Sequence, residues 1–218
     1  MPLIIDLDNT LYNYDIAHKF ALHSVHIYIN NIVELNEQKF KRIFLNARRD
    51  LHKLLNNTGS SHNKQLQLKL VLESLGIFTL NRLIEITEVY EKNFLLSMQP
   101  YPYVAQFLEN YNGNICVLTD YTLEVQLKKL KALNLLDKIN FIVCSEEIGT
   151  DKPCKLMFYR ALDLLRVEPH EAVMIGDDLV KDYYGAKQIG LRALLFAPDG
   201  APQNDVLTFK SFKELWEN

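Results

Sequence analysis

The chain has 218 residues, of which 48% are hydrophobic and 23% charged, and its formal net charge is −3. This length suits one large domain or a core domain with an insertion, and the composition is ordinary for a globular protein. The small negative charge excludes a broad basic field, so neither nucleic acid nor an acidic membrane surface is an expected partner.

The first predicted element is a short buried strand from Leu3 to Asp6, and a second aspartate follows at Asp8. Like charges this close repel each other. A carboxylate at the end of a buried strand is energetically unfavourable unless a positive charge lies near it. A solvated turn is one interpretation of the pair. A metal-assisted phosphate site is the other, and the rest of the chain has to decide between them.

Tyr12, Tyr14 and Asp15 follow the two aspartates. They stand where the first strand gives way to a segment of different character. In that place they would either face a substrate or pack as part of a hinge, and the sequence leaves both interpretations open.

The stretch 15–98 contains no good strand candidate. Its apolar residues recur at helical spacing, and a polar break at 56–64 separates two helical patterns. We therefore expect an all-helical domain at 15–98, inserted into a core domain made of residues 1–14 and 99–218.

Short apolar runs alternate with helical patterns after this insert. Each run has Ile, Val, Leu or Phe at consecutive positions, as in strands that are covered on both faces. The alternation indicates right-handed crossovers and a parallel sheet. The predicted fold class is therefore α/β, a Rossmann-like, doubly wound parallel sheet with an inserted all-helical domain. The predicted later strands are 115–119, 141–144, 172–175 and 191–196, and the helices between them are 122–133, 153–165 and 181–189.

Polar residues follow most of the predicted strands at their carboxyl ends, where open parallel sheets bind ligands. Mg²⁺ prefers oxygen ligands and is usually held by one or two carboxylates together with substrate oxygens. An ammonium group would screen both a carboxylate nucleophile and an incoming phosphate. The mixture at this edge therefore predicts a Mg²⁺-assisted phosphate site. Its candidate residues are Asp6, Asp8, Thr119, Asp120, Lys152, Asp177, Asp178 and Asp182.

The two aspartates after the first strand can perform different steps. We expect Asp6 to be the nucleophile, because carboxylates form aspartyl-phosphate intermediates. Asp8 would protonate the leaving oxygen and later deprotonate water. A metal would relieve the repulsion between Asp6 and Asp177, and Thr119 would donate a hydrogen bond to the phosphoryl group. Taken one at a time, the same residues also fit turns and helix caps.

Four segments, DLDNTLY, LTD, DKP and GDDLVKD, occur in this order between Asp6 and Asp182. Together they resemble the four-motif signature of the haloacid dehalogenase-like hydrolase superfamily. The DxDx[TV] form of the first motif is similar to that of its phosphatase branch, and the helical insert resembles the C1 cap of the family. Dehalogenases of the superfamily lack the second aspartate, which is present here as Asp8.

The resemblance implies a metal site built from three residues. Asp6 would be both the nucleophile and a Mg²⁺ ligand. Asp8 would be the general acid and base and would bind the metal through its backbone carbonyl. Asp177 would be the other carboxylate ligand.

The resemblance also implies contacts to the substrate. Thr119 and Lys152 would bind its phosphate, and Asp120 is placed with them, although many relatives have Asn at that position. Asp178 and Asp182 would support the metal or its waters and orient Lys152.

The expected function is that of a Mg²⁺-dependent phosphomonoesterase that acts on a small phosphorylated metabolite through an aspartyl-phosphate. A nucleoside 5′-monophosphate and a sugar phosphate are both open as substrates, and the oligomeric state is open too. One alternative is a phosphomutase of the β-phosphoglucomutase type, which would share the site. The other is a non-catalytic phosphate-binding or regulatory relative.

The three cysteines, Cys116, Cys144 and Cys154, have no CxxC spacing, and two of them lie in apolar runs where a buried thiol is ordinary. This usage indicates a reducing compartment. The N-terminus shows no basic segment followed by an apolar stretch, and no run reaches membrane-spanning length. We therefore expect a cytoplasmic protein.

Overall fold

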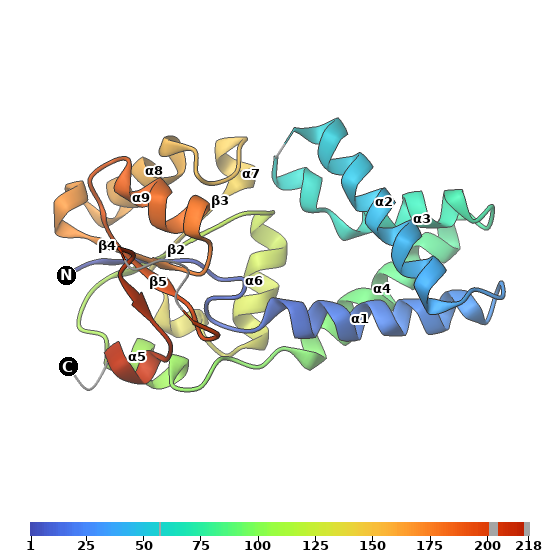
Figure 1. Ribbon diagram of the computed structural model, residues 1–218, viewed down its shortest axis with the longest axis horizontal. Helices are drawn as coiled ribbons and strands as arrows, with labels where there is room; N and C mark the ends of the chain where they lie inside the picture. The colour runs from blue at the N-terminus through green and yellow to red at the C-terminus, as the bar shows by residue number, and fades with distance from the viewer. Residues whose placement is uncertain (57, 201–204, 216–218) are drawn as a thin grey trace. The chain divides into compact units, whose positions relative to one another are not determined.

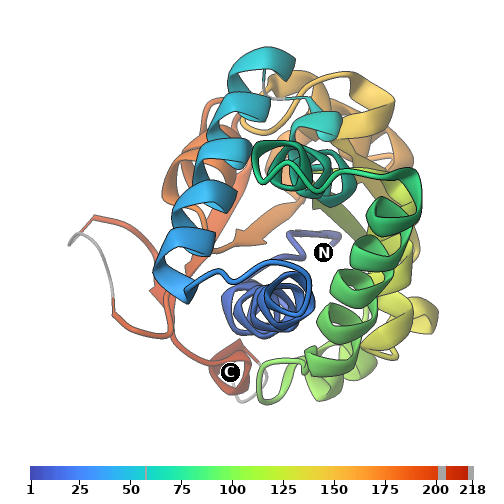
Figure 2. The same cartoon turned by 90° about the vertical axis from the view of Figure 1, so that its right-hand side faces the viewer.

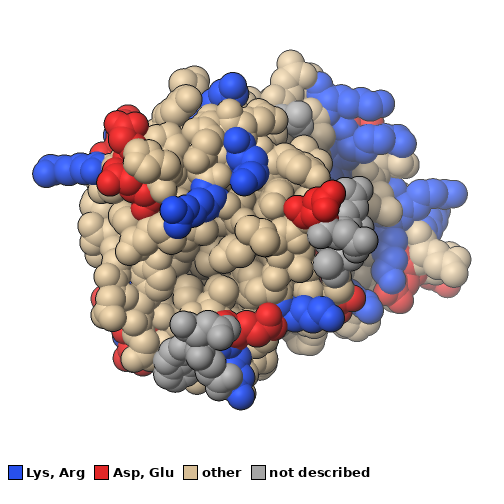
Figure 3. Space-filling model, turned by 60° about the vertical axis from the view of Figure 1, so that its left-hand side comes forward, with Lys and Arg blue, Asp and Glu red and all other residues tan. Residues whose placement is uncertain are grey.

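The computed structural model describes residues 1–56, 58–200 and 205–215 (Figure 1). The chain divides into two compact units. The first consists of Met1–Asn13 and Gln99–Asn218, and the second of Tyr14–Met98. Lys, Arg, Asp and Glu are interspersed on the face drawn in Figure 3, and neither sign covers it, in keeping with the small net charge.

The first unit is built on a six-stranded parallel sheet with the strand order β3-β2-β1-β4-β5-β6. Strand β1 lies inside the sheet, and its Ile4 pairs with Cys116 of β2 and Met174 of β4. The predicted α/β fold class is therefore confirmed. The sixth strand was not predicted, because two residues are too few to leave a pattern. The strands are β1 (Leu3–Ile5), β2 (Ile115–Thr119), β3 (Phe141–Cys144), β4 (Val173–Gly176), β5 (Arg192–Phe196) and β6 (Thr208–Phe209).

Helices cover both faces of this sheet. Figure 1 shows α8 (Lys155–Leu165) and α9 (Gly185–Lys187) on one side and α5 (Val104–Asn110) on the other. Strands β1, β2 and β4 are buried along their whole length, which accounts for their uninterrupted apolar sequences. The remaining helical elements of this unit are α6 (Leu123–Ala132), η2 (Leu136–Lys138), α7 (Ser145–Ile148), η3 (Pro169–Glu171), η4 (Leu179–Tyr184) and η5 (Phe212–Leu215).

The structure has a helix in the predicted segment 181–189, with different bounds and an unusual form. The segment begins earlier, at Leu179, as the π-helix η4, and continues into the single α-helical turn of α9. Asp178 starts it, because its Oδ1 accepts hydrogen bonds from the backbone N–H groups of Val180 and Lys181 at 2.8 and 2.9 Å. A π-helix is rare and is frequently found at functional sites.

The second unit is all helical in its described residues. Helix α1 (Tyr14–Asn30) packs against α4 (Leu80–Ser97), and α2 (Glu37–Leu55) packs against α3 (Lys64–Ser74), as Figure 2 shows, with η1 (Gly59–His62) between α2 and α3. Buried residues recur every four positions on α1, which is the spacing of one helix face. In the part of the chain that the structure describes, no helix has both the length and the apolarity needed to cross a bilayer.

Candidate active site

The candidate site lies in the first unit, at the carboxyl ends of neighbouring strands. Asp6 follows β1, Thr119 ends β2, and Asp177 follows β4. Because these strands are parallel neighbours, their carboxyl ends share one edge of the sheet. The backbone N–H of Asp6 donates to the carbonyl of Ile175 at 2.8 Å, so the sheet pairing continues up to the first site residue.

Lys152 stands at the centre of the charges on this edge. Its side chain is buried, and its Nζ donates to Oδ1 of Asp6 at 2.5 Å and to Oδ1 of Asp182 at 2.7 Å. Burial by itself would lower the pKa of Lys152, but the carboxylates of Asp182, Asp6 and Asp120 outweigh it and raise that pKa well above its usual value. Lys152 is therefore a fixed cation that faces the predicted nucleophile.

Asp6, Asp177 and Asp182 form an acidic cluster in which one carboxylate oxygen from each lies within 4.8 Å of the others. Burial raises the pKa of Asp6 despite the nearby Lys152, and burial together with the charge of Asp182 raises the pKa of Asp177 to about 7. Three carboxyl groups thus share one ammonium. The negative charge of these carboxylates exceeds the positive charge of Lys152, and their oxygens converge. Such a cluster suits a divalent cation such as Mg²⁺.

The chain turns back sharply after Asp8 and adds a hydroxyl to this cluster. Asn9 adopts a left-handed conformation (φ 63°), which asparagine tolerates, and the N–H of Leu11 donates to the carbonyl of Leu7 at 3.0 Å. The turn places the buried Thr10 so that its Oγ1 lies 3.0 Å from Oδ2 of Asp6 and 3.2 Å from Oδ1 of Asp177. Thr10 therefore ties the β1 carboxylate to the β4 carboxylate.

Asp182 is held on both of its oxygens. Oδ1 accepts from Lys152, and Oδ2 accepts from the backbone N–H of Asp178 at 3.1 Å. A Cβ on Gly176 would overlap the Asp182 carboxylate, so the absence of a side chain at the end of β4 is what lets Asp182 lie there. This arrangement suits Asp182 to orienting Lys152, and it leaves Asp6 and Asp177 better placed to bind a metal.

Asp8 has its own set of partners. Lys129 of α6 is buried and donates to both carboxylate oxygens of Asp8 at 2.7 Å. The hydroxyl of Tyr12 donates to Oδ1, and Nε2 of Gln126 lies 3.4 Å from Oδ2. Burial favours the neutral acid, but Lys129 and these hydrogen bonds outweigh it and lower the pKa of Asp8. Tyr12 thus contacts Asp8, one of the predicted site residues.

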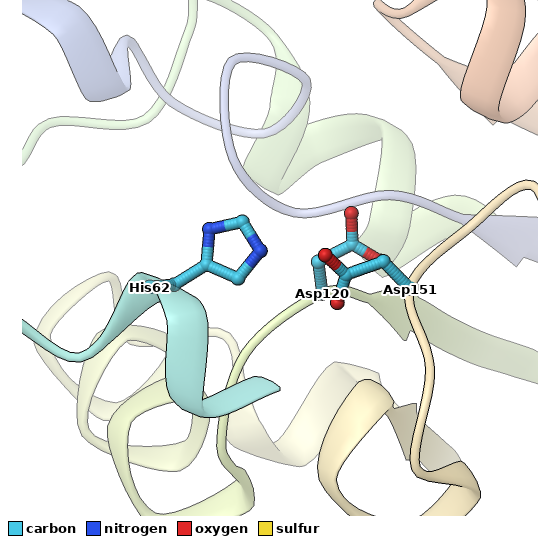
Figure 4. A group of neighbouring side chains, drawn as sticks. All are labelled: His62, Asp120 and Asp151. Atoms are coloured by element: carbon cyan, nitrogen blue, oxygen red, sulfur yellow. The ribbon is translucent and has the colours of Figure 1, made fainter. Parts of the chain in front are cut away.

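Thr119 and Asp120 end β2 in different environments. Oγ1 of Thr119 accepts from Nε2 of Gln126 at 2.5 Å and is buried. The carboxylate of Asp120 accepts from the backbone N–H of Lys152 at 2.9 Å and from Nζ of Lys181 at 2.6 Å. Figure 4 shows the Asp120 side chain close to that of Asp151, the residue before Lys152.

The structure therefore brings the predicted residues to one edge of the sheet. The side chain of Asp178 is exposed; its backbone N–H donates to Asp182, and its carboxylate caps the start of η4. Sequence reasoning missed four participants: Thr10, Gln126, Lys129 and Lys181. Thr10 carried a signal, because it is the T of the DxDx[TV] pattern. The other three lie on helices, in polar stretches of sequence that look like ordinary solvent-exposed helix faces.

Comparisons with known proteins agree with this architecture. The sequence profile of the haloacid dehalogenase-like hydrolases matches residues 3–190. Ribulose-1,5-bisphosphate 5-phosphatase of Halopiger xanaduensis is 30% identical over 201 residues, which are 90% of this chain and 84% of that protein. Glyceraldehyde 3-phosphate phosphatase of Methanopyrus kandleri is 28% identical over 214 residues, 93% of this chain and 88% of that protein. The crystal structure of a 2-haloacid dehalogenase from Pseudomonas syringae has a TM-score of 0.76 at 23% identity and covers 99% of this chain and 96% of that one, a likeness of fold alone.

The parallel sheet and the family match define a hydrolase: the chain belongs to the haloacid dehalogenase-like hydrolases. The phosphatases that align over most of its length place it more narrowly, as a phosphatase of that family. The family resemblance predicted from the four motifs is confirmed.

Proposed function

We propose that the protein is a Mg²⁺-dependent phosphomonoesterase that works through a phosphoryl group carried on Asp6. The observation that carries the proposal is the buried arrangement of Asp6 between Lys152, at 2.5 Å, and the acidic cluster that it forms with Asp177 and Asp182. A carboxylate at such a position is both a nucleophile and a metal ligand. Mg²⁺ would be held by Asp6, Asp177 and the backbone carbonyl of Asp8, and it would supply neutralisation of phosphate charge.

The chain's own residues then account for both halves of the reaction. A carboxylate oxygen of Asp6 forms a bond to phosphorus as the bond to the ester oxygen breaks, and Asp8 gives its proton to the departing alkoxide. In the second half Asp8 takes a proton from water, the water oxygen bonds to phosphorus, and the bond to Asp6 breaks. Lys152 stays cationic throughout and binds the phosphoryl oxygens. In the structure Asp8 is the carboxylate partner of Lys129, which is the form that takes a proton from water. Asp8 therefore takes up a proton from solvent before it acts as the acid in the first half of the reaction.

The substrate class that we propose is a small phosphorylated sugar. The support comes from the relatives, since one is named for ribulose-1,5-bisphosphate and another for glyceraldehyde 3-phosphate. Nucleoside 5′-monophosphates are the second class to be tested. We further propose that the unit Tyr14–Met98 is the cap that selects among these compounds, and that the protein works in the reducing cytoplasm, where its three free cysteines stay reduced.

A substrate panel tests this function directly. Ribulose-1,5-bisphosphate, glyceraldehyde 3-phosphate, UMP, glucose 1-phosphate and 4-nitrophenyl phosphate are each incubated with the protein in MgCl₂ or in EDTA, and inorganic phosphate is measured. We expect phosphate release that requires Mg²⁺ and is fastest with a sugar phosphate. Conversion of glucose 1-phosphate to an isomer without phosphate release would make the protein a mutase. No reaction with any compound would mark it as a non-catalytic relative.

The covalent intermediate needs a separate measurement. The reaction is quenched in acid during turnover, and the peptide that contains Asp6 is examined by mass spectrometry. We expect that peptide to carry one phosphoryl group. Turnover with the label on another residue, or with no label under conditions that preserve acyl phosphates, would contradict the assignment of Asp6.

A further inference from the structure

The carboxylate of Asp120 joins three other segments of the active-site edge. Oδ1 accepts from the backbone N–H of Lys152 at 2.9 Å, and the hydroxyl of Ser145, at the start of α7, lies 3.3 Å from the same oxygen. Oδ2 accepts from Nζ of Lys181, in η4, at 2.6 Å. The end of β2 is thus connected to α7, to the loop that carries Lys152 and to the π-helix.

The charge of Asp120 argues against direct contact with the substrate's phosphate. Its side chain is only 15% exposed, and both of its oxygens accept hydrogen bonds from the chain itself. Burial would raise the pKa of Asp120, but Lys152 and Lys181 outweigh it and lower that pKa, so the group is an anion. An anion in this position repels a phosphate.

Asp120 binds Lys152 and Lys181, and both of these lysines are connected to Asp182. Lys152 is tied to Asp120 through its backbone, and its Nζ reaches Asp6 and Asp182. Lys181 is tied to Asp120 through its side chain, and it directly precedes Asp182 in η4. One carboxylate therefore anchors both the catalytic lysine and the segment that supplies the partner of that lysine.

We propose that Asp120 is a positioning residue for Lys152, and that Lys181 is its obligatory charge partner. The proposal rests on the function proposed above and adds to it two residues that act through Lys152 and Asp182. It predicts that Asp120 and Lys181 act together, since loss of either charge breaks the same ion pair and frees η4, which supplies Asp182.

A double-mutant cycle tests the unit. D120N keeps an oxygen that can accept from the Lys152 N–H but loses the charge that holds Lys181, and K181M removes the cation. We expect each variant to lower kcat about tenfold with KM changed less than about threefold, and the double variant to lose about tenfold, not about a hundredfold. K181R should recover most of the activity. Additive losses, or D120N with unchanged kcat and tighter inhibition by inorganic phosphate, would overturn the proposal.

The pair Lys138 and Glu109 serves as the matched control. It also joins two elements through one ion pair, at 2.9 Å, and its lysine side chain is about as exposed as that of Lys181. We expect K138M and E109Q to leave kcat and KM unchanged. A loss of kcat as large as that of K181M would show that other ion pairs of the α/β domain affect catalysis equally, which contradicts a specific role for Asp120.

Hydrogen exchange reports on the anchor without relying on activity. In D120A the backbone N–H of Lys152 loses its acceptor, so the peptide that contains Lys152 should exchange faster than in the wild type, whereas in D120N it should stay protected. Unchanged exchange in D120A would overturn the proposal even if activity fell. A wild-type protein that hydrolyses no phosphate ester would instead refute the proposed function, and the exchange result would then decide on the anchor alone. Thermal unfolding confirms that each variant is folded.

Discussion

Asp6 is the partner of a buried lysine, and the proposed function also makes it the nucleophile and a metal ligand. An amide at this position keeps the size of the side chain but is a poor nucleophile. We expect D6N to lower kcat on 4-nitrophenyl phosphate by at least about a thousandfold, as losses of covalent nucleophiles do. The measurement is phosphate release in MgCl₂. D163N, on the exposed side of α8, is the control and should keep full activity. A D6N variant with wild-type turnover would refute the nucleophile assignment.

Lys129 illustrates how a buried charge depends on its partner. Its side chain is 3% exposed, and that of Asp8 is 30% exposed. Breaking a fully buried ion pair on one side costs about 3–5 kcal/mol, and the partial exposure of Asp8 reduces this, so we expect K129M to lower the free energy of unfolding by about 1–3 kcal/mol at pH 7. Because Lys129 lowers the pKa of Asp8, that contribution is present above the unfolded pKa of Asp8 and is lost as the pH falls through its folded pKa.

Urea unfolding at several pH values measures this difference. The neighbouring Lys128 is the control, since its ion pair with Glu124 is exposed to solvent, and K128M should change the stability by no more than about 0.5 kcal/mol. Equal effects of K128M and K129M would mean that the contact between Lys129 and Asp8 contributes nothing to stability.

Among the contacts between secondary-structure elements, the close approach of β4 to η4 supports the site most directly. A Cβ on Gly176 would overlap the Asp182 carboxylate and come within 2.5 Å of the Asp182 Cβ. We expect G176A to push Asp182 away from Lys152, to lower kcat by about a hundredfold or more, and to destabilise the fold by about 1–3 kcal/mol as overpacking does.

The control for this prediction is G190A. Gly190 has a φ of 84° and no close neighbour, so an alanine there brings strain of about 1 kcal/mol without touching the site. Phosphate release and thermal unfolding of both variants separate lost activity from lost stability. A G176A protein as active as G190A would show that η4 can shift at no cost to the chemistry.

The same elements show what the sequence could predict. Strand cores are local patterns, and the polar residues that follow them, such as Asp6, Thr119 and Asp177, are expected at one edge as soon as the sheet is known to be parallel. Their roles in catalysis stay predictions. The partners on helices could not be found in this way. Lys128 and Lys129 are adjacent lysines in one helical pattern, and only the packing of α6 decides that Lys129 is buried against Asp8 while Lys128 lies in solvent.

The start of η4 shows a second limit. The apolar spacing after Asp178 fits an α-helix as well as a π-helix, so the pattern predicts a helix but not its form. Asp182 of the π-helix makes contacts that are distant in sequence or lie outside the helix: it accepts a hydrogen bond from Lys152 and packs against Gly176. Local propensity contains no information about such contacts.

For the molecule as a whole, the acidic cluster links stability to pH and to metal. The single positive charge of Lys152 faces three carboxyl groups, and the pKa of Asp177 is raised from 3.8 to about 7. A folded pKa above the unfolded one contributes stability that is fully present below pH 3.8 and is lost as the pH rises through about 7. Without metal, the folded protein should therefore lose stability between about pH 4 and pH 7 from this group.

In the proposed site Mg²⁺ would compete with the proton for the same carboxyl groups, so its stabilising effect should have the opposite trend. We expect the rise in Tm on replacing EDTA by MgCl₂ to be small at pH 5 and to grow up to pH 8, reaching an equivalent of about 2–3 kcal/mol once Mg²⁺ exceeds its dissociation constant a hundredfold. In D177N, which has no proton to displace at position 177, the rise should be small at every pH. A Tm difference that is constant from pH 5 to pH 8 in the wild type would show that Mg²⁺ binds away from the cluster, and it would remove Asp177 from the metal site.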